Sequence, residues 1–269
     1  MLAGRRNGEA IRERADALVA GDPSGALDRF RTLVRSSAFS SNVSADKVAV
    51  FQETGCVLDG RAIAQHRAGG DRRAGLRAFR GEQGEWYTRR VRFEAVWLSG
   101  RRFVYGALNA GGMGTERHFG PFCLVIDDPR SASPAALGVF PANSAKRYCS
   151  PAGVVDGDLA RGEVVAWCDR ADLAAVERAA EVLVADERDW PAVLCDATHF
   201  LEAVVAPAPA VDAISAVRVR QTYLERLEDL EGRVLAGDVL HGTDSREATA
   251  FEALTTWRRT RAVAIESVG

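Results

Sequence analysis

The 269-residue chain has few of the residues that build metal sites and disulfide frameworks. Its five cysteines are scattered, odd in number and form no C-x-x-C pair. The four histidines share no ligand spacing with them. We therefore expect no bound metal and a reducing compartment, in which free thiols persist.

Long apolar runs are also missing. The longest apolar stretch, 203–217, is interrupted by Pro207, Pro209 and Asp212, so it is not expected to cross a membrane. The first sixteen residues, MLAGRRNGEAIRERAD, contain no apolar signal-peptide core, although a dedicated secretion machinery would leave no such mark. The sequence predicts a cytoplasmic protein with no membrane partner.

Lysine is nearly absent. Of the 35 cationic residues, only Lys47 and Lys146 are lysines, a bias typical of a GC-rich genome, so arginine pairs are weak evidence for nucleic-acid binding. The charges are unevenly placed, with 11 cations and 4 anions in 61–102 but 12 cations and 22 anions in 151–269. The two parts can pair with each other, or the basic segment can bind an anionic partner.

Standard catalytic signatures are missing too. The chain has no P-loop, no G-x-G-x-x-G between strand and helix, no H-E-x-x-H and no G-x-S-x-G. Its glycine-rich segment 111–114 (GGMG) follows an expected strand and lacks the helix N-terminus of a phosphate cradle. A flexible hairpin loop is the favoured interpretation.

What remains is a chain of 47% hydrophobic and 27% charged residues, enough for one large domain with a core. Apolar periodicity predicts helices in the first forty residues, broken at 22–25, and again downstream.

Three later helices are expected, at 169–183, 223–234 and 251–257, and Asp169 is the expected cap of the first. Loops with one short helix are expected over 55–85, and the Ser-rich segment leads into an expected strand that begins at Lys47. The expected strands are 47–51, 91–97, 103–108, 122–126, 163–168 and 199–206. Because strands and helices do not alternate regularly, the pattern favours an α+β fold with mainly antiparallel strands.

Glu202 is unusual for its place in a strand. Alternation puts it between Phe200 and Val204 on one face, with Leu201 and Ala203 on the other. An unpaired charge is costly to bury, so either that face is solvated or the carboxylate has a function.

Two aromatic–glycine pairs flank the glycine-rich loop. Tyr105-Gly106 and Phe119-Gly120 can each offer a flat ring with backbone room beside it, suited to a planar ligand. They can equally be ordinary core aromatics. Arg117 and His118, just before Phe119, can bind an anion or lie on the surface.

Several short motifs resemble a bacterial family of domains of unknown function. That family has YGALN, a spacer, RFGSC and an apolar strand, and here Tyr105–Asn109 reads YGALN and Arg117–Cys123 reads RHFGPFC. The family's F-H-P strand end would correspond to Val50–Glu53, and its Y-[IV]-E-A-[QH]-V strand to Phe200–Val205. Gly69–Arg72 resembles its G-G-D-R segment. The resemblance covers roughly 40–220.

The family looks like a distant relative of the ADP-ribosyltransferases. The resemblance implies a split, mainly antiparallel β-sandwich that holds NAD in a cleft, over residues 41–220, with helical segments 1–40 and 221–269. It implies that Glu202 is catalytic and that NAD contacts come from six residues. They are Gln52, Tyr105, Gly106, Arg117, Phe119 and Gly120.

Three positions depart from the family pattern. Gln52 replaces a histidine, His118 interrupts the RFG motif, and Val204 replaces a polar residue after the glutamate. The leading hypothesis is an NAD-consuming ADP-ribosyltransferase that modifies a protein or nucleic-acid acceptor, with a bacterial toxin or effector as a candidate role. The alternatives are a non-catalytic NAD- or nucleotide-binding module and an NAD glycohydrolase.

Overall fold

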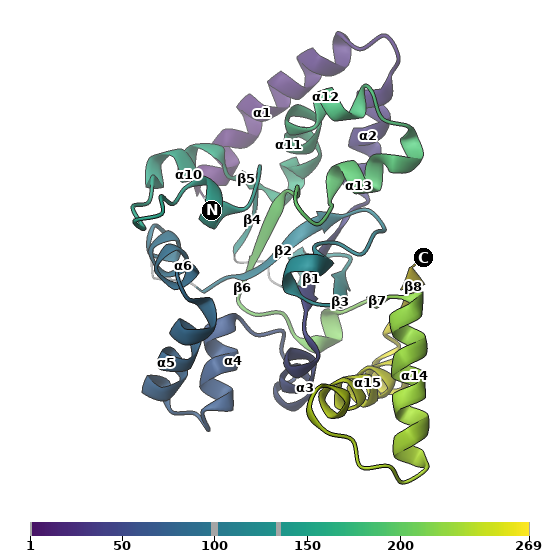
Figure 1. Ribbon diagram of the computed structural model, residues 1–269. Helices are drawn as coiled ribbons and strands as arrows, with labels where there is room; N and C mark the ends of the chain where they lie inside the picture. Colours follow the sequence, from purple (N-terminus) through teal and green to yellow (C-terminus); the bar gives the residue numbers. More distant parts are fainter. Residues whose placement is uncertain (1, 98–101, 133–135, 269) are drawn as a thin grey trace.

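Eight strands form a single sheet at the centre of the molecule (Figure 1). The computed structural model describes residues 2–97, 102–132 and 136–268. The order across the sheet is β5-β4-β6-β2-β1-β3-β7-β8. The strands are β1 (Ala38–Val43), β2 (Val104–Asn109), β3 (Phe122–Ile126), β4 (Ala136–Phe140), β5 (Val165–Ala166), β6 (Glu202–Ala206), β7 (Ala216–Arg220) and β8 (Ala264–Val268).

The described pairs are antiparallel, apart from the parallel pair β7 and β8. This confirms a mixed class of helices with a mainly antiparallel sheet. β2 lies between β1 and β6, and its Gly106 faces Ala203 while its Ala107 faces Glu202. The strand that carries the YGALN motif is therefore the direct neighbour of the strand that carries Glu202.

Both faces of β6 are buried, in the alternation that the sequence predicts. Leu201, Ala203 and Val205 belong to the main core, whereas Val204 packs in a second cluster around Phe93. No face of β6 is left for solvent, so Glu202 is not a wet position on an edge strand.

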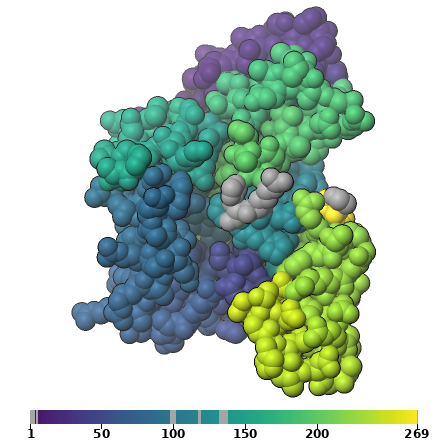
Figure 2. Space-filling model, in the orientation of Figure 1, coloured from purple at the N-terminus to yellow at the C-terminus, as the bar shows by residue number. Residues whose placement is uncertain are grey.

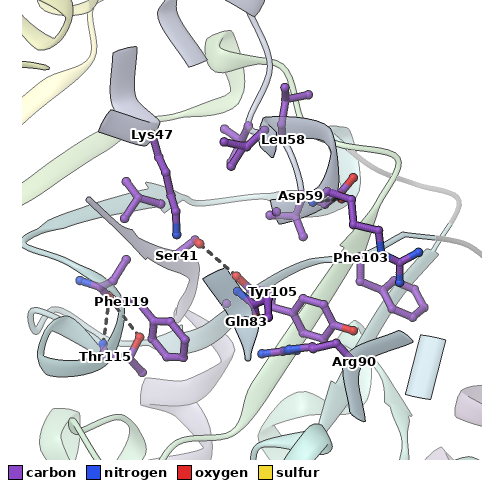
Figure 3. Close-up of a pocket in the computed structure, with 18 of the residues that line it drawn as sticks. Ser41, Lys47, Leu58, Asp59, Gln83, Arg90, Phe103, Tyr105, Thr115 and Phe119 are labelled. Atoms are coloured by element: carbon purple, nitrogen blue, oxygen red, sulfur yellow. Dashed lines mark hydrogen bonds between the residues drawn. The ribbon is translucent and has the colours of Figure 1, made fainter. Parts of the chain in front are cut away.

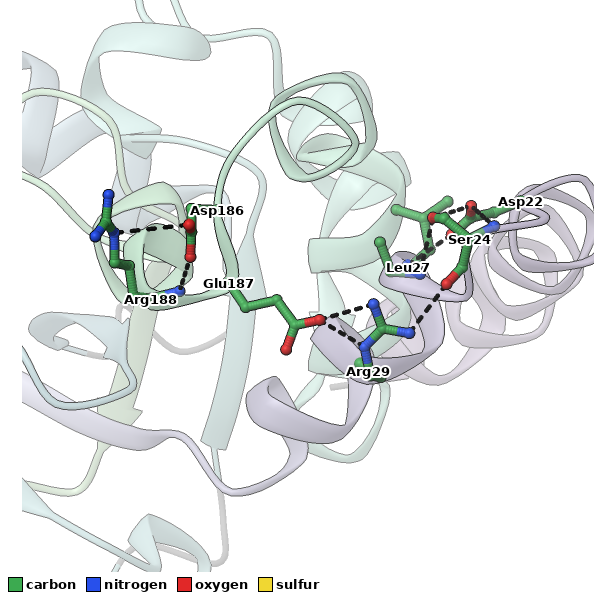
Figure 4. Close-up of polar contacts among 8 residues, drawn as sticks. Asp22, Ser24, Leu27, Arg29, Asp186, Glu187 and Arg188 are labelled. Atoms are coloured by element: carbon green, nitrogen blue, oxygen red, sulfur yellow. Dashed lines mark hydrogen bonds and ion pairs between the residues drawn. The ribbon is translucent and has the colours of Figure 1, made fainter.

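The N-terminal helices pack together on one part of the sheet. α1 (Leu2–Ala20) packs against α10 (Gly157–Glu163), α11 (Arg170–Glu177) and β5, and α2 (Ala26–Arg35) also packs against α11. The predicted break between them is confirmed. The Asp22 carboxylate accepts hydrogen bonds from the backbone N–H groups of Ser24 and Leu27, each at 2.9 Å, which fixes the turn (Figure 4). Arg29 then pairs with Glu187 at 2.7 Å, tying α2 to the loop before α13 (Trp190–Leu194).

The C-terminal segment forms a helical hairpin. α14 (Gln221–Leu235) and α15 (Gly242–Arg261) confirm the two predicted helices, and α15 packs against α3 (Ala45–Thr54). The segment does not end as a helix, because β8 adds a strand beside β7.

A helical arm projects beside the sheet. It consists of α4 (Gly60–Arg67), α5 (Arg72–Gln83) and α6 (Trp86–Ala95). On the face seen in Figure 2, α3 lies between this arm and the α14–α15 hairpin. The other short helices are α7 (Glu116–Phe119), α8 (Pro129–Ala132), α9 (Ser144–Arg147) and α12 (Ala179–Val182), with 3₁₀ turns at Trp167–Asp169, Glu187–Asp189 and Val211–Ala213.

Two predicted strands are wrong. Residues 47–51 lie in α3, which begins after Ser44 and ends at Gly55 in the left-handed conformation. Residues 91–97 fall mainly in α6, where the apparent alternation comes from a short helix whose Phe93 and Glu94 are both buried. Short apolar runs fit both periodicities, so period alone does not separate strand from helix.

Three further predictions need correction. The expected strand lies earlier in the chain than predicted, because the Ser-rich segment itself forms the central strand β1, although serine is not a typical strand residue. Residues 55–85 carry two helices, each started by a capping aspartate, Asp59 and Asp71. Of the expected strand 163–168, only Val165–Ala166 forms a strand, β5. Asp169 precedes α11 but makes no capping bond there, since its carboxylate pairs with Arg12 at 3.1 Å.

Within the described ranges, no helix is both long enough and apolar enough to cross a membrane. All five cysteines are free thiols.

Candidate functional site

A cavity of about 150 Å³ lies where the helical arm meets the middle of the sheet. Its walls come from β1, β2 and β6 on the sheet side and from α3, α4, α5 and α6 on the helix side. Figure 3 shows aromatic and charged side chains directed into this cleft. The cleft therefore brings together segments that are far apart in sequence.

Glu202 forms the polar floor of the cleft. Its side chain is only 2% exposed, and its carboxylate accepts hydrogen bonds from the Ser144 hydroxyl and, at 3.2 Å, from the Ser144 backbone N–H. The guanidinium of Arg90 lies 3.9 Å from its other oxygen. Burial raises the pKa of Glu202, and Arg90 and Ser144 oppose that rise.

Tyr105 and Arg90 form a stacked pair in the cleft. The Arg90 guanidinium lies against the Tyr105 ring (Figure 3), 3.7 Å from its centre. The Tyr105 hydroxyl donates to Glu94 at 3.2 Å, and Glu94 also pairs with Arg61 of α4. Burial raises the pKa of Tyr105 and of Glu94, so the tyrosine stays protonated and can donate. One Nη atom of Arg90 is buried without a hydrogen-bond partner among the described atoms.

Two asparagines organise the glycine-rich loop at the edge of the cleft. Asn109 accepts hydrogen bonds from the backbone N–H groups of Gly111 and Gly112, each at 2.9 Å. Asn42 of β1 donates to the Met113 carbonyl at 2.9 Å and accepts from the Thr115 N–H at 2.8 Å. The loop is thus held to the sheet and is not the freely flexible hairpin that the sequence favours.

Four of the seven residues predicted from the sequence line the cleft: Tyr105, Gly106, Phe119 and Glu202. Gly106 allows close strand packing, since a Cβ there would lie 2.3 Å from the Ser40 carbonyl oxygen and 2.5 Å from the Phe39 ring.

Gly120 lies next to the cleft rather than in its wall. Its φ is 130°, a conformation that L side chains rarely adopt, and its carbonyl accepts a hydrogen bond from Asn42 at 3.2 Å. The side chain of Arg117 lies outside the described part of the structure, so its predicted role stays a prediction.

Gln52 is not in the wall of the cleft. It lies on α3, where its side-chain oxygen accepts a hydrogen bond from the indole N–H of buried Trp257 on α15. The sequence places Gln52 at the end of an early strand, which is wrong. The early strand of the sheet is β1, and its polar residues Ser41 and Asn42 line the cleft.

Sequence reasoning missed most polar residues of the cleft, among them Ser41, Lys47, Arg90 and Glu94. Arg90 and Glu94 were placed together on the polar side of an expected strand. Their spacing of four residues is the signal that was available, because it puts both on one face of a helix.

Among the described residues, no group of three or more histidine, cysteine, aspartate or glutamate side chains could hold a metal ion. No known family model matches the chain, and no curated protein matches it either.

Proposed function

We propose that the chain is an ADP-ribosyltransferase that consumes NAD in this cleft. The observation that carries the proposal is the convergence of Glu202 and Tyr105, which sequence motifs assign to catalysis and ring stacking. They lie on the adjacent strands β6 and β2, with Phe119 at the same cavity. The split sandwich that the family resemblance implies is part of the proposal, although the eight described strands pair into one sheet.

The reaction needs a carboxylate beside the reacting ribose. Cleavage of the bond between nicotinamide and the ribose C1′ sends its electron pair to the nicotinamide nitrogen, leaving a ribose with oxocarbenium character. Glu202 stabilises that positive charge and holds a ribose hydroxyl. An acceptor nucleophile then bonds to C1′ and releases its proton, so NAD and acceptor give nicotinamide, the ADP-ribosylated acceptor and a proton.

The size of the cleft limits what it can enclose. Ligand pockets commonly span about 300–1,000 Å³, whereas this cavity measures about 150 Å³. It suits one planar ring and its attached sugar, so the adenosine half of NAD would lie outside. Arg90 covers one face of the Tyr105 ring, which leaves the opposite face for a ligand.

An acidic macromolecule is the acceptor that the surface charge favours. Arg72, Arg73, Arg77 and Arg80 of α5 are exposed, and within the described part of the chain none of them forms an ion pair. Between 61–97 and 151–268, only Arg90 and Glu202 pair among described residues. The basic and acidic parts therefore do not neutralise each other.

A non-catalytic NAD- or nucleotide-binding module is the second candidate. Two observations favour it: Ser144 already engages the Glu202 carboxylate, and Gln52 is bonded to Trp257 away from the cleft. An NAD glycohydrolase would use the same residues with water as the acceptor.

Incubation with NAD labelled separately in nicotinamide and in adenylate separates the three functions. The proposal predicts nicotinamide release together with label on a macromolecule in a lysate, and both fall about 10²–10³-fold in Glu202→Gln. Free ADP-ribose without macromolecular label would identify a glycohydrolase. Binding without release from the wild-type protein would identify the non-catalytic module.

A further inference from the structure

Lys47 is a cation of the cleft without a partner of its own. It lies in the first turn of α3 and is partly buried, and its ammonium group points into the cavity toward Ser41 (Figure 3). Within the described residues, the ammonium forms no ion pair or hydrogen bond. Asp46 and Glu82 act on it only through space, and both already pair with Arg67.

The other cations of the cleft each lie within ion-pair distance of a lining carboxylate. Arg61 pairs with Glu94, and Arg90 lies against Tyr105 and 3.9 Å from Glu202. The remaining lining carboxylate, Asp59, accepts from two backbone N–H groups at the start of α4. Lys47 is thus the lining cation that has no carboxylate within ion-pair distance among the described residues.

Leaving this amine without a partner is costly. Burial lowers the pKa of Lys47, and the nearby carboxylates of Asp46 and Glu82 offset only part of that effect. An anion that entered the cleft would form a charge-assisted hydrogen bond in a partly desolvated site, where such bonds are strongest.

We propose that Lys47 binds a phosphate group of the ligand, so that the cleft selects phosphorylated ligands with a planar ring. The ring would lie between Tyr105 and Phe119, and the phosphate would lie on the α3 side, near Lys47 and Ser41. A free amine is a compact donor that suits a phosphate oxygen. The identification of that ligand as NAD rests on the proposed function, but the phosphate site does not.

The near-absence of lysine makes a direct test possible. Reductive methylation with ¹³C-formaldehyde keeps the charge and labels Lys47, Lys146 and the N-terminal amine. Lys146 is exposed on α9 and serves as an internal control. The probes are inorganic pyrophosphate, AMP, NAD and, without phosphate, adenosine.

We expect pyrophosphate, AMP and NAD to shift the Lys47 methyl resonance saturably and to leave that of Lys146 in place, whereas adenosine shifts neither. Equal, non-saturating shifts at both lysines, or no shift at Lys47, would overturn the proposal. This measurement uses the wild-type chain, so it does not depend on the folding of a variant.

Variants then separate the phosphate site from the reaction. Lys47→Gln should weaken AMP binding about tenfold or more, whereas Lys47→Arg and Lys146→Gln should stay close to wild type. Phosphate binding at Lys47 without NAD cleavage would contradict the proposed function but support the phosphate site at Lys47. NAD cleavage with an unchanged KM in Lys47→Gln would support the proposed function but contradict the phosphate site at Lys47.

Discussion

Glu202 occupies a costly position, and the proposed function gives its carboxylate a chemical role. Its carboxylate is buried, and Ser144 and Arg90 offset only part of the burial, so the folded chain favours the protonated form more than the unfolded chain does. Between the ordinary glutamate pKa and this raised pKa, the folded state binds more protons. The free energy of unfolding contributed by Glu202 therefore falls as the pH rises through that range.

Glu202→Gln should consequently be more stable than wild type at neutral pH while losing turnover. The gain in thermal unfolding midpoint should shrink as the pH is lowered toward 4, where the wild-type carboxyl is protonated. Differential scanning calorimetry at several pH values measures this. Glu228→Gln, an exposed change on α14, is the control and should show no such trend. A destabilised Glu202→Gln at neutral pH would contradict the account of the buried charge.

The pH dependence of nicotinamide release should reflect the same carboxyl groups. Because burial raises the pKa of both Glu202 and Glu94, kcat/KM should fall on acidification at a higher pH than the value of about 4.3 for an ordinary glutamate. The acid limb reports the coupled groups of the cleft rather than one residue. An acid limb at or below the ordinary value would be the contrary result.

Gly106 tests the packing beneath the cleft. An alanine Cβ would lie 2.3 Å from the Ser40 carbonyl oxygen, so the strands β1 and β2 would have to separate. Gly106→Ala should cost roughly 1–3 kcal/mol of unfolding free energy, as overpacking does, measured by chemical denaturation. Gly112→Ala, where no atom lies within 4 Å of the added Cβ, should leave stability nearly unchanged. Equal effects at the two glycines would show that close strand packing is not what Gly106 provides.

At the scale of elements, the contact between α3 and α15 explains why Gln52 lies elsewhere than predicted. The Trp257 indole is buried and donates to the Gln52 side chain, so this glutamine joins the C-terminal hairpin to the sheet domain. Gln52→Ala would leave that N–H without a partner, at a cost of about 1–3 kcal/mol. The folded variant should still release nicotinamide at the wild-type rate.

The comparison is Gln221→Ala, an exposed glutamine on α14 whose side-chain bond goes to exposed Glu225. It should change stability by no more than about 0.5 kcal/mol. A large loss of NAD affinity in folded Gln52→Ala, without a change in stability, would support the predicted contact between Gln52 and NAD.

The basic face of α5 gives a prediction about the acceptor. Arg73→Glu with Arg77→Glu should reduce labelling of an acidic acceptor several-fold, with strong salt dependence in the wild type. Nicotinamide release into water should not change, since neither residue lines the cleft. The control is Arg258→Glu with Arg259→Glu, which reverses the same amount of exposed charge on α15. Identical labelling by both double variants would argue against docking on α5.

The sequence predicts elements well where one period dominates and poorly where two periods fit. The terminal helices and the strands 103–108 and 122–126 follow from long or strongly apolar patterns. The segments 47–51 and 91–97 are short runs that fit helix and strand equally, so their period could not identify the helices α3 and α6. β1 has no strong strand propensity and forms because β2 and β3 pair with it on both sides.

The residues of the cleft are predictable from the sequence mainly where the secondary structure of their segment is. Glu202 and Tyr105 lie in segments that the sequence correctly predicts as strands, whereas Phe119, which also lines the cleft, lies in the unpredicted short helix α7. Lys47, Arg90 and Glu94 were not predicted because their segments were assigned as strands. A side chain's direction follows from its element.

At the scale of the whole molecule, the near-neutral total charge of −2 hides a segregation that folding preserves. The helical arm carries arginines on α5 that form no ion pair among the described residues. Many acidic groups of the C-terminal part pair with arginines of that part, as Arg226 does with Asp244 and Glu247. The sheet sets Glu202 and Tyr105 side by side, and the arm closes a small cavity over them. The proposed function uses both features, the arginines of α5 for an anionic acceptor and the Glu202 carboxylate for the reaction.

A crystal structure with a non-hydrolysable NAD analogue tests this arrangement most directly. The account predicts the nicotinamide ring in contact with Tyr105 or Phe119 and the adjoining ribose within hydrogen-bond distance of the Glu202 carboxylate. An analogue bound elsewhere, with the cleft still closed around Ser144 and Arg90, would contradict it.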